Sequence, residues 1–218
     1  MLFDRSKPVY KFVDPAVADI VAAGSLRIGT LRSYGRLESA RADPHEASAI
    51  LNAKVQNSAL LTNEQNALLA YHGINISGRN NRWITIEGHK TSIVNLHCLC
   101  FSDCPDAGPP EAHAVFEVAD VMDLASTLTA MYEATLGPAC QVGKIEYASR
   151  DGGLDGKAVY ADPFVKPPSF SWEKEIRMIW LEPRRDRAAL TAYPPGGGIE
   201  RFDTPSSSRV SGLLRRIR

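Results

Sequence analysis

The chain has 218 residues, with 25 Lys plus Arg against 25 Asp plus Glu, so it carries no overall charge that would attract nucleic acid or lipid. Its length suits one domain, and we expect a single domain over residues 1–218. No apolar run approaches the roughly 18 residues that span a bilayer, and the first residues lack the apolar core of a signal peptide, which predicts a cytoplasmic protein without a membrane partner.

Hydrophobic periods and turn residues predict most of the elements. In chain order they are strand 9–13, helix 16–23, strand 26–30, helix 62–72, strands 74–77, 83–87, 93–101 and 113–118, helix 120–136, and strands 141–147 and 172–181. Residues 78–81 and 88–90 have turn compositions, whereas residues 47–56 show no clean period. The run 93–101 is apolar on both faces, which predicts a central strand. The part from Pro194 onward is predicted to be a loop before a short basic end.

Predicted strands outnumber predicted helices, and the two do not alternate regularly. This order disfavours a doubly wound parallel sheet. It favours an α+β domain with few helices, built on a mainly antiparallel sheet or on two small sheets packed together.

Four cysteines are clustered too closely for the disulfide framework of a small secreted domain: Cys98, Cys100, Cys104 and Cys140. Together with His97 they suggest a zinc site. In a strand, however, His97 points away from Cys98 and Cys100, and there is no second ligand pair at a usual distance. We therefore expect free, buried thiols and no metal.

The segment 169–180 contains a notable charge pattern. As a strand, it places Glu173, Glu175 and Arg177 on one face. The opposite face then carries the apolar side chains of Trp172, Ile176, Met178 and Trp180. Two carboxylates beside one guanidinium are typical either of a solvated strand face or of a site that stabilises a positively charged reacting centre.

The segment Asp43-Pro44-His45-Glu46 also has two interpretations. As a helix start, Asp43 is the N-cap, Pro44 the first helical residue and Glu46 the third residue of a capping-box variant. In the second interpretation, His45 and Glu46 combine with Glu173 and Glu175 to form a carboxylate-rich metal site of the kind found in nucleases. The capping interpretation explains the segment without a metal.

The basic C-terminal end is a second candidate contact for nucleic acid. It contains Arg215, Arg216 and Arg218. On a neutral protein, such an end is more often simply solvated, and the net charge gives no support for a nucleic-acid partner.

Five short segments, in a fixed order, resemble a widespread bacterial family of unknown function. They are Tyr10-Lys11-Phe12, Leu26-Arg27-Ile28-Gly29-Thr30, Ala42-Asp43-Pro44-His45-Glu46, Cys100-Phe101-Ser102 and Trp172-Glu173-Lys174-Glu175-Ile176-Arg177. The resemblance covers about residues 9–182 and leaves residues 183–218 as a variable C-terminal extension. Position 45 departs from the family, which usually has Phe there.

The order of these parts is also similar to the mono-ADP-ribosyltransferase fold. Enzymes of that fold carry an Arg or His on an early strand, a strand ending in an aromatic-x-Ser type motif, and a late Glu-x-Glu before an apolar strand. Phe101-Ser102 and Glu173-Lys174-Glu175 match the last two parts, and Lys11 or Arg27 is the candidate for the first. The resemblance implies an ADP-ribosyltransferase-like α+β domain that takes NAD as its substrate.

The resemblance also implies roles. Cleavage of the nicotinamide glycosidic bond builds positive charge on the ribose, which a preorganised carboxylate stabilises. Glu175 is the candidate for that carboxylate, Glu173 would orient or activate the acceptor, and Ser102 would brace Glu175. The remaining candidates for substrate binding are Lys11 or Arg27 at the pyrophosphate, with Tyr10 and Arg177 nearby.

The leading hypothesis is NAD-dependent ADP-ribosyl transfer or NAD hydrolysis, with toxin or phage-defence systems as the setting that the resemblance suggests. One alternative is a non-catalytic nucleotide- or nucleic-acid-binding module of the same fold, and another is a metal-dependent nuclease. The sequence leaves the acceptor and the oligomeric state open. The transferase hypothesis predicts that Glu175, Ser102 and either Lys11 or Arg27 converge in one cleft, whereas a solvated strand face would leave the glutamates in open solvent.

Overall fold

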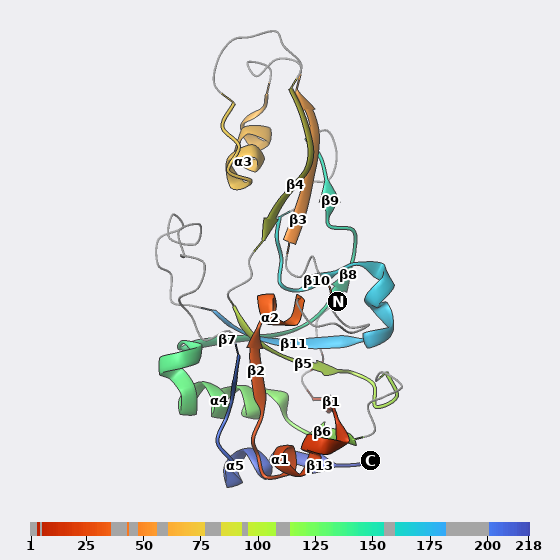
Figure 1. Ribbon diagram of the computed structural model, residues 1–218, viewed down its shortest axis with the longest axis vertical. Helices are drawn as coiled ribbons and strands as arrows, with labels where there is room; N and C mark the ends of the chain where they lie inside the picture. Colours follow the sequence, from red (N-terminus) through yellow and green to blue (C-terminus); the bar gives the residue numbers. More distant parts are fainter. Residues whose placement is uncertain are drawn as a thin grey trace.

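The structure is a computed structural model, which describes residues 4, 6–35, 43, 48–55, 61–76, 84–92, 96–107, 114–154, 160–181 and 201–218. Over these residues the fold is α+β with mostly antiparallel sheets and few helices, as predicted. Figure 1 shows an elongated molecule, with the main sheet and helix α4 (Val121–Leu136) toward one end. The antiparallel pair of β3 (Ser48–Val55) and β4 (Ile84–Ser92) projects at the other end.

The main sheet follows the order β12-β2-β5-β1-β6-β13, and β11 and β7 extend it from β5. Its strands are β1 (Val9–Val13), β2 (Arg27–Thr30), β5 (His97–Ser102), β6 (Ala114–Val118), β7 (Ala139–Lys144), β11 (Glu175–Leu181), β12 (Arg201–Asp203) and β13 (Leu214–Arg216). Every pairing among them is antiparallel. β5 pairs with β1, β2 and β11, which confirms the predicted central strand.

Helix α4 covers one face of this sheet and confirms the predicted helix 120–136. Its N-cap Asp120 accepts hydrogen bonds from the amides of Met122 and Asp123, both at 2.9 Å, and Gly137, with φ of 91°, follows its last turn. Apolar side chains of α4 and of the sheet form the main core, including Val121, Leu124, Leu128, Leu99, Phe116, Ile176, Met178 and Trp180. Trp180 also donates its indole N–H to Thr129 Oγ1 at 2.9 Å, so its polar atom is satisfied.

The connection from β1 to β2 contains the 3₁₀ helix η1 (Pro15–Val17) and helix α1 (Ala18–Ala22), where one helix over 16–23 was predicted. Asp14 caps it as expected and accepts from the Ala16 amide at 2.8 Å. Gly24 then adopts a φ of 83°, and a Cβ there would lie 2.1 Å from the Ser207 carbonyl oxygen. Glycine therefore allows the C-terminal segment to pack on this turn. After β2, helix α2 (Leu31–Gly35) follows directly, in a segment for which no element was predicted.

The projecting part consists of the sheet β4-β3-β9, with β9 at Asp151–Gly152, and helix α3 (Asn63–Tyr71). Thr62 and Gln65 form a capping box at the start of α3, which confirms the predicted helix 62–72. β3 falls in the region that showed no period. The predicted strand at 74–77 is wrong for its described residues, 74–76.

The predicted turn at 88–90 is also wrong, because β4 continues through it. Gly88 adopts a φ of 61° and donates its amide to Asn52 Oδ1 at 2.8 Å, where the β3 register shifts between Leu51 and Ala53. The turn composition thus marks a β-bulge and not the end of a strand.

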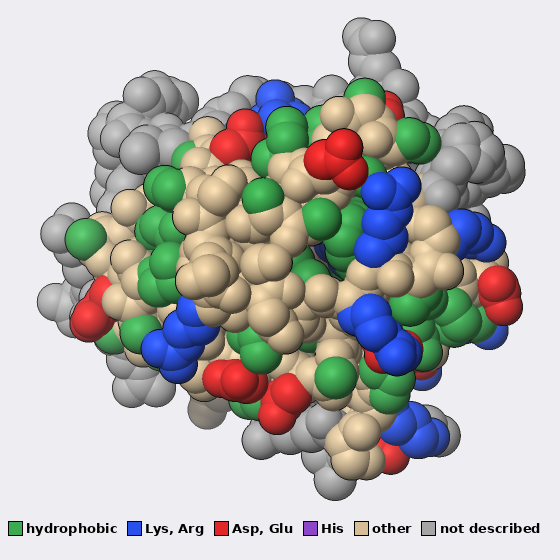
Figure 2. Space-filling view, turned by 90° about the horizontal axis from the view of Figure 1, so that it is seen from below, with side chains coloured by type: hydrophobic (Ala, Val, Ile, Leu, Met, Phe, Trp, Pro, Cys, Tyr) green, Lys and Arg blue, Asp and Glu red, His purple; other side chains and the backbone are tan. Residues whose placement is uncertain are grey.

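The C-terminal segment is part of the main sheet, where a loop and a basic end were predicted. β12 pairs with β2, helix α5 (Ser208–Ser211) follows with Ser207 as its N-cap, and β13 pairs with β6. Arg215 bonds Glu117 at 2.6 Å. Arg216 lies 3.4 Å from Asp19, and Figure 2 shows basic and acidic side chains interspersed on the face that carries α1, α5 and β13. This arrangement agrees with a solvated end.

Candidate functional site

A cavity of about 500 Å³ lies where strands β1 and β2 of the main sheet separate from each other along β5. β11 pairs with β5 along one edge of that strand, so β1 and β2 both pair with its other edge. β2 pairs at His97 and Cys98, whereas β1 pairs only at Ser102, which leaves the two strands apart over the middle of β5. In this interval the Lys11 ammonium donates to the Cys100 carbonyl oxygen at 2.9 Å.

The wall of the cavity brings together all seven candidate residues: Tyr10, Lys11, Arg27, Ser102, Glu173, Glu175 and Arg177. The exposed fractions of Glu173 and Glu175 are only 5% and 3%. The solvated-face interpretation of these two glutamates is therefore wrong. Their chemical roles stay predictions.

The local structure around the two glutamates differs from the predicted strand. Residues Pro168–Glu173 form the 3₁₀ helix η3, and β11 begins only at Glu175. Between them, Lys174 adopts a left-handed conformation with φ of 46° and ψ of 47°, which costs about 1 kcal/mol for a residue with a Cβ. Glu173 therefore does not share a strand face with Glu175, and Trp172 is 40% exposed and not in the core.

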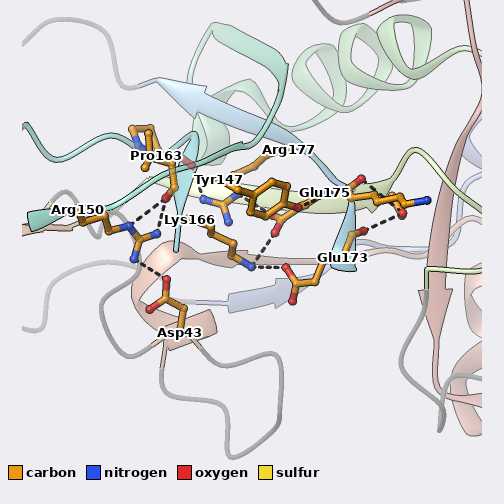
Figure 3. Close-up of polar contacts among 11 residues, drawn as sticks. Asp43, Tyr147, Arg150, Pro163, Lys166, Glu173, Glu175 and Arg177 are labelled. Carbon is orange, nitrogen blue, oxygen red and sulfur yellow. Dashed lines mark hydrogen bonds and ion pairs between the residues drawn. The ribbon is translucent and has the colours of Figure 1, made fainter. Parts of the chain in front are cut away.

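Lys166 brings the two glutamates together. It belongs to β10 (Val165–Lys166), which pairs in parallel with β8 (Glu146–Tyr147). Its ammonium lies 2.6 Å from Glu173 Oε2 and 2.7 Å from Glu175 Oε2. Figure 3 shows Lys166 between the two glutamates. All three side chains are at most 6% exposed.

Arg177 holds the other oxygen of Glu175. The two residues are on one face of β11, as predicted, and Arg177 Nε lies 2.8 Å from Glu175 Oε1. Arg177 NH1 donates to the Pro163 carbonyl oxygen. Arg177 is only 1% exposed and thus holds Glu175 from a buried position at the cavity wall, and its predicted contact with substrate stays a prediction.

Ser102 pairs with Glu175 across β5 and β11, and its predicted role as a brace of Glu175 stays a prediction. Its hydroxyl donates to the Glu173 carbonyl oxygen at 2.9 Å, and the Asp103 amide donates to the Lys174 carbonyl oxygen, also at 2.9 Å. These contacts fix the left-handed turn between the two glutamates. The Glu175 amide is held separately, because it donates to Tyr147 Oη at 2.8 Å.

The two carboxyl groups have opposite pKa shifts. Burial alone would raise the pKa of Glu175, but Arg177 and Lys166 outweigh it and hold that pKa well below its ordinary value. Burial dominates at Glu173, with the charge of Glu175 opposing Lys166, and raises its pKa to about 7. Near neutral pH, Glu175 therefore keeps its charge while Glu173 exchanges a proton.

The cavity wall also carries aromatic and cationic side chains. Tyr10, Phe101 and Tyr34 line it, and the Lys11 ammonium lies 5.7 Å from the centre of the Phe101 ring. Arg27 is half exposed and makes a two-point contact with Asp203, at 2.7 Å from Nε to Oδ1 and 2.9 Å from NH2 to Oδ2.

Several of these site residues were not predicted. Lys166 lies in Phe164-Val165-Lys166-Pro167-Pro168, where nothing in the pattern distinguishes a buried lysine from an exposed one. Tyr34, Tyr147 and Asp203 depend on long-range packing in the same way. Gly143 carries a weak signal, as a glycine inside a predicted strand. A Cβ at Gly143 would lie 3.0 Å from the Phe164 ring, so glycine lets the segment that carries Lys166 cross the sheet.

The metal-site alternative is only partly described. His45 and Glu46, with Pro44, lie outside the described residues. Asp43 is described and forms a buried ion pair with Arg150. Among described side chains, no group of three or more His, Cys, Asp or Glu residues is placed to hold a metal ion. The cysteines include no disulfide, and Cys98 is buried while Cys100, Cys104 and Cys140 are partly buried.

Comparisons with protein-family models, with curated proteins and with solved structures found no match to this chain. The family resemblance and the ADP-ribosyltransferase-like fold thus stay predictions. In the described part of the chain, no helix has the length and apolar character needed to cross a membrane.

Proposed function

We propose that the cavity binds NAD or a closely related nucleotide and cleaves the bond between nicotinamide and ribose, with transfer of ADP-ribose to an acceptor or to water. The observation that carries this proposal is the pair of buried carboxylates, Glu173 and Glu175, that share the Lys166 ammonium at the wall of the cavity. An ADP-ribosyltransferase-like architecture is part of the proposal.

The size and lining of the cavity support a nucleotide ligand. A volume of about 500 Å³ falls within the range of about 300–1,000 Å³ that small-molecule sites occupy. Tyr10, Tyr34 and Phe101 offer aromatic surface for a planar ring, and Lys11 and Arg27 offer cations for a pyrophosphate. Charged carboxylates are present at the same wall, where a positively charged ribose would need them.

The two glutamates suit different steps. As the C–N bond breaks, its electron pair leaves with nicotinamide and positive charge develops on the ribose ring. Glu175 stays ionised because Arg177 and Lys166 lower its pKa, so it offers a fixed negative charge to that ring. Glu173 has a pKa of about 7, which suits a general base that takes a proton from the attacking hydroxyl or water.

The test is nicotinamide release from NAD by the purified protein, together with the change in melting temperature that NAD causes. Wild type should release nicotinamide and be stabilised by NAD. Glu175→Gln should lower kcat by about 100-fold or more while NAD still stabilises the protein, because the lost charge acts on the transition state.

Glu117→Gln is the matched control. Glu117 lies on β6, pairs with Arg215 and is not part of the cavity wall, so this variant should keep wild-type activity. If wild type neither releases nicotinamide nor is stabilised by NAD, the proposal fails. Wild-type activity in Glu175→Gln would overturn the role given to Glu175.

A specific observation favours a second candidate, a nucleotide-binding module without catalysis. Both oxygens of Glu175 are engaged, Oε1 by Arg177 and Oε2 by Lys166, so part of its charge is already compensated. This candidate predicts that NAD or another nucleotide stabilises the protein with no nicotinamide release.

The nuclease hypothesis has less support. Lys166 Nζ lies within hydrogen-bonding distance of both carboxylates, so the bridging cation between these glutamates is an ammonium. A metal between the same oxygens would have to displace it. Stabilisation by Mg²⁺ or Mn²⁺ and not by NAD would favour the nuclease.

A further inference from the structure

The segment that carries Lys166 is held at four consecutive carbonyl groups. β8 and the residue after it hold two of them, because the Glu146 amide donates to Phe164 at 2.8 Å and the Ala148 amide donates to Lys166 at 2.9 Å. Arginines hold the other two. Arg177 donates to the Pro163 carbonyl, and Arg150 donates through Nε to the Val165 carbonyl at 3.1 Å and through NH2 to the same oxygen.

The guanidinium of Arg150 also contacts Asp43, a residue far from it in the sequence. Its NH1 lies 2.5 Å from Asp43 Oδ2, and the two side chains are only 5% and 2% exposed (Figure 3). The planar guanidinium thus connects a carboxylate on one side to a backbone carbonyl on the other. Val165, the residue that it holds, is the immediate neighbour of Lys166.

We propose that Asp43 and Arg150 are positioning residues for Lys166, the ammonium that the two carboxylates of the site share. A buried guanidinium that is bonded to Asp43 and to the Val165 carbonyl has little freedom, so that carbonyl is fixed with it. The adjacent side chain of Lys166 then projects from an immobilised backbone between Glu173 and Glu175. This gives Asp43, which the sequence suggested only as a helix cap, a part in the site.

The pH at which Glu173 titrates depends on the position of the Lys166 ammonium. Among the described residues, the charged or titratable groups that act on Glu173 are Lys166 from β10, Glu175 from β11 and Tyr147 from β8, and Arg177 acts on Glu175. Lys166 is the cation that lowers the pKa of Glu173, and it is the one whose backbone neighbour Arg150 holds. Displacement of Lys166 should therefore raise the pH at which Glu173 titrates, while Arg177 keeps Glu175 ionised.

The direct test is an NMR titration of protein labelled with ¹³C at the Glu side-chain carboxyls, with the Glu173 signal assigned as the one absent from Glu173→Gln. The wild-type midpoint should lie near pH 7. In Arg150→Met the midpoint should move to higher pH, and in Asp43→Asn it should move the same way by less. A folded Arg150→Met protein with the wild-type midpoint would overturn the proposal.

General destabilisation is controlled by Leu68→Ala, which removes a buried side chain of the α3 cluster away from the cavity wall. Its Glu173 midpoint should equal that of wild type, and a shift as large as that of Arg150→Met would contradict the proposal. Arg150→Lys keeps the positive charge and loses the planar fork, so it should give an intermediate shift. If Arg150→Met does not fold, Arg150→Lys and Asp43→Asn decide the question by the same criterion.

A kinetic version of the test rests on the proposed function. The pH profile of kcat for nicotinamide release should move to higher pH in Asp43→Asn and Arg150→Lys, with KM for NAD within about twofold of wild type. If NAD is not cleaved, the proposed function fails and the NMR titration still decides the positioning. If NAD is cleaved but neither the profile nor the titration moves, only the positioning proposal fails.

Discussion

The Lys166 ammonium lies 2.6 Å from Glu173 Oε2, and both side chains are almost completely buried. The same ammonium is 2.7 Å from Glu175 Oε2, so one cation serves two carboxylates. A buried carboxylate that loses its partner keeps its desolvation penalty without compensation. Lys166 is therefore the residue whose positive charge compensates both the Glu173 and the Glu175 carboxylate.

Lys166→Met should lower the free energy of unfolding by about 3–5 kcal/mol, because Glu173 and Glu175 lose the ammonium that compensates their burial. Urea denaturation at pH 8 measures the loss. The matched control is Lys144→Met, since Lys144 pairs with Asp103 at 2.5 Å with 38% and 29% of the two side chains exposed. That exposed pair should contribute less than about 1 kcal/mol. Equal losses of unfolding free energy in Lys166→Met and Lys144→Met would show that the burial of Lys166 with Glu173 and Glu175 does not increase the contribution of these ion pairs to stability.

The double variant Lys166→Met/Glu173→Gln should recover part of the lost stability, because Gln carries no charge to bury. The measurement is a double-mutant cycle from the two single variants and the double variant. Strict additivity would contradict a direct interaction between Lys166 and Glu173.

The raised pKa of Glu173 has a consequence for stability against pH. Because its pKa is about 7 in the folded protein and 4.5 ordinarily, the folded state binds the proton more tightly between these values. The contribution of Glu173 to stability therefore falls as pH rises from about 4.5 to 7, by at most about 3 kcal/mol. Glu175, with its lowered pKa, acts in the opposite sense and only below about pH 4.5.

Glu173→Gln removes this dependence, so its stability should exceed that of wild type increasingly from pH 4.5 to 7. Urea denaturation at half-unit intervals of pH provides the difference. The same slope in both proteins over this interval would contradict the raised pKa. Glu117→Gln again serves as the control for loss of a glutamate outside the cavity wall.

Part of this site followed from the sequence, and the reasons are specific. Glu175 and Arg177 were correctly placed on one face, because both lie on β11, where the period of two holds. Glu173 was expected there too, but the left-handed Lys174 interrupts the strand, and no local pattern marks lysine as the residue that adopts this conformation. Lys166 was missed because its buried position depends on the pairing of β10 with β8 and on contacts with Glu173 and Glu175, which no local pattern predicts.

In the fold, too, elements that depend on local sequence were predicted, and an element that depends on long-range pairing was missed. Helices α3 and α4 were predicted because their capping residues and apolar periods are local. β3 was missed, since residues 47–56 lack alternation and the strand depends on β4 and β9 for its pairing. The turn-like composition at 88–90 was misleading because the same residues form a bulge.

Gly143→Ala should destabilise the protein by about 1–3 kcal/mol, because the new methyl group would lie 3.0 Å from the Phe164 ring. The strain should be smaller when Phe164 is already replaced by Leu. Thermal unfolding of Gly143→Ala, Phe164→Leu and the double variant measures this coupling. A cost for Gly143→Ala that does not change in the Phe164→Leu background would show that the contact is not responsible.

Arg27 and Asp203 offer a prediction for ligand affinity. Their contact is more than half exposed on both sides, so Asp203→Asn should change stability by less than about 1 kcal/mol. The same variant releases Arg27 from a competing carboxylate and should tighten binding of NAD, whereas Arg27→Met should weaken it. Calorimetric titration with NAD tests both, and tighter binding to Arg27→Met would exclude a contact between Arg27 and the pyrophosphate.

Strand β12 covers the edge of β2 and also supplies Arg201 and Asp203 to the cavity wall. Its neighbour Thr204 bonds Leu26 and Ser25, residues almost 180 positions earlier in the chain. During synthesis, the cavity wall therefore stays incomplete until residues 201–204 have left the ribosome. A protein shortened before residue 201 would expose the edges of β2 and β6 and lack Arg201 and Asp203 of the cavity wall.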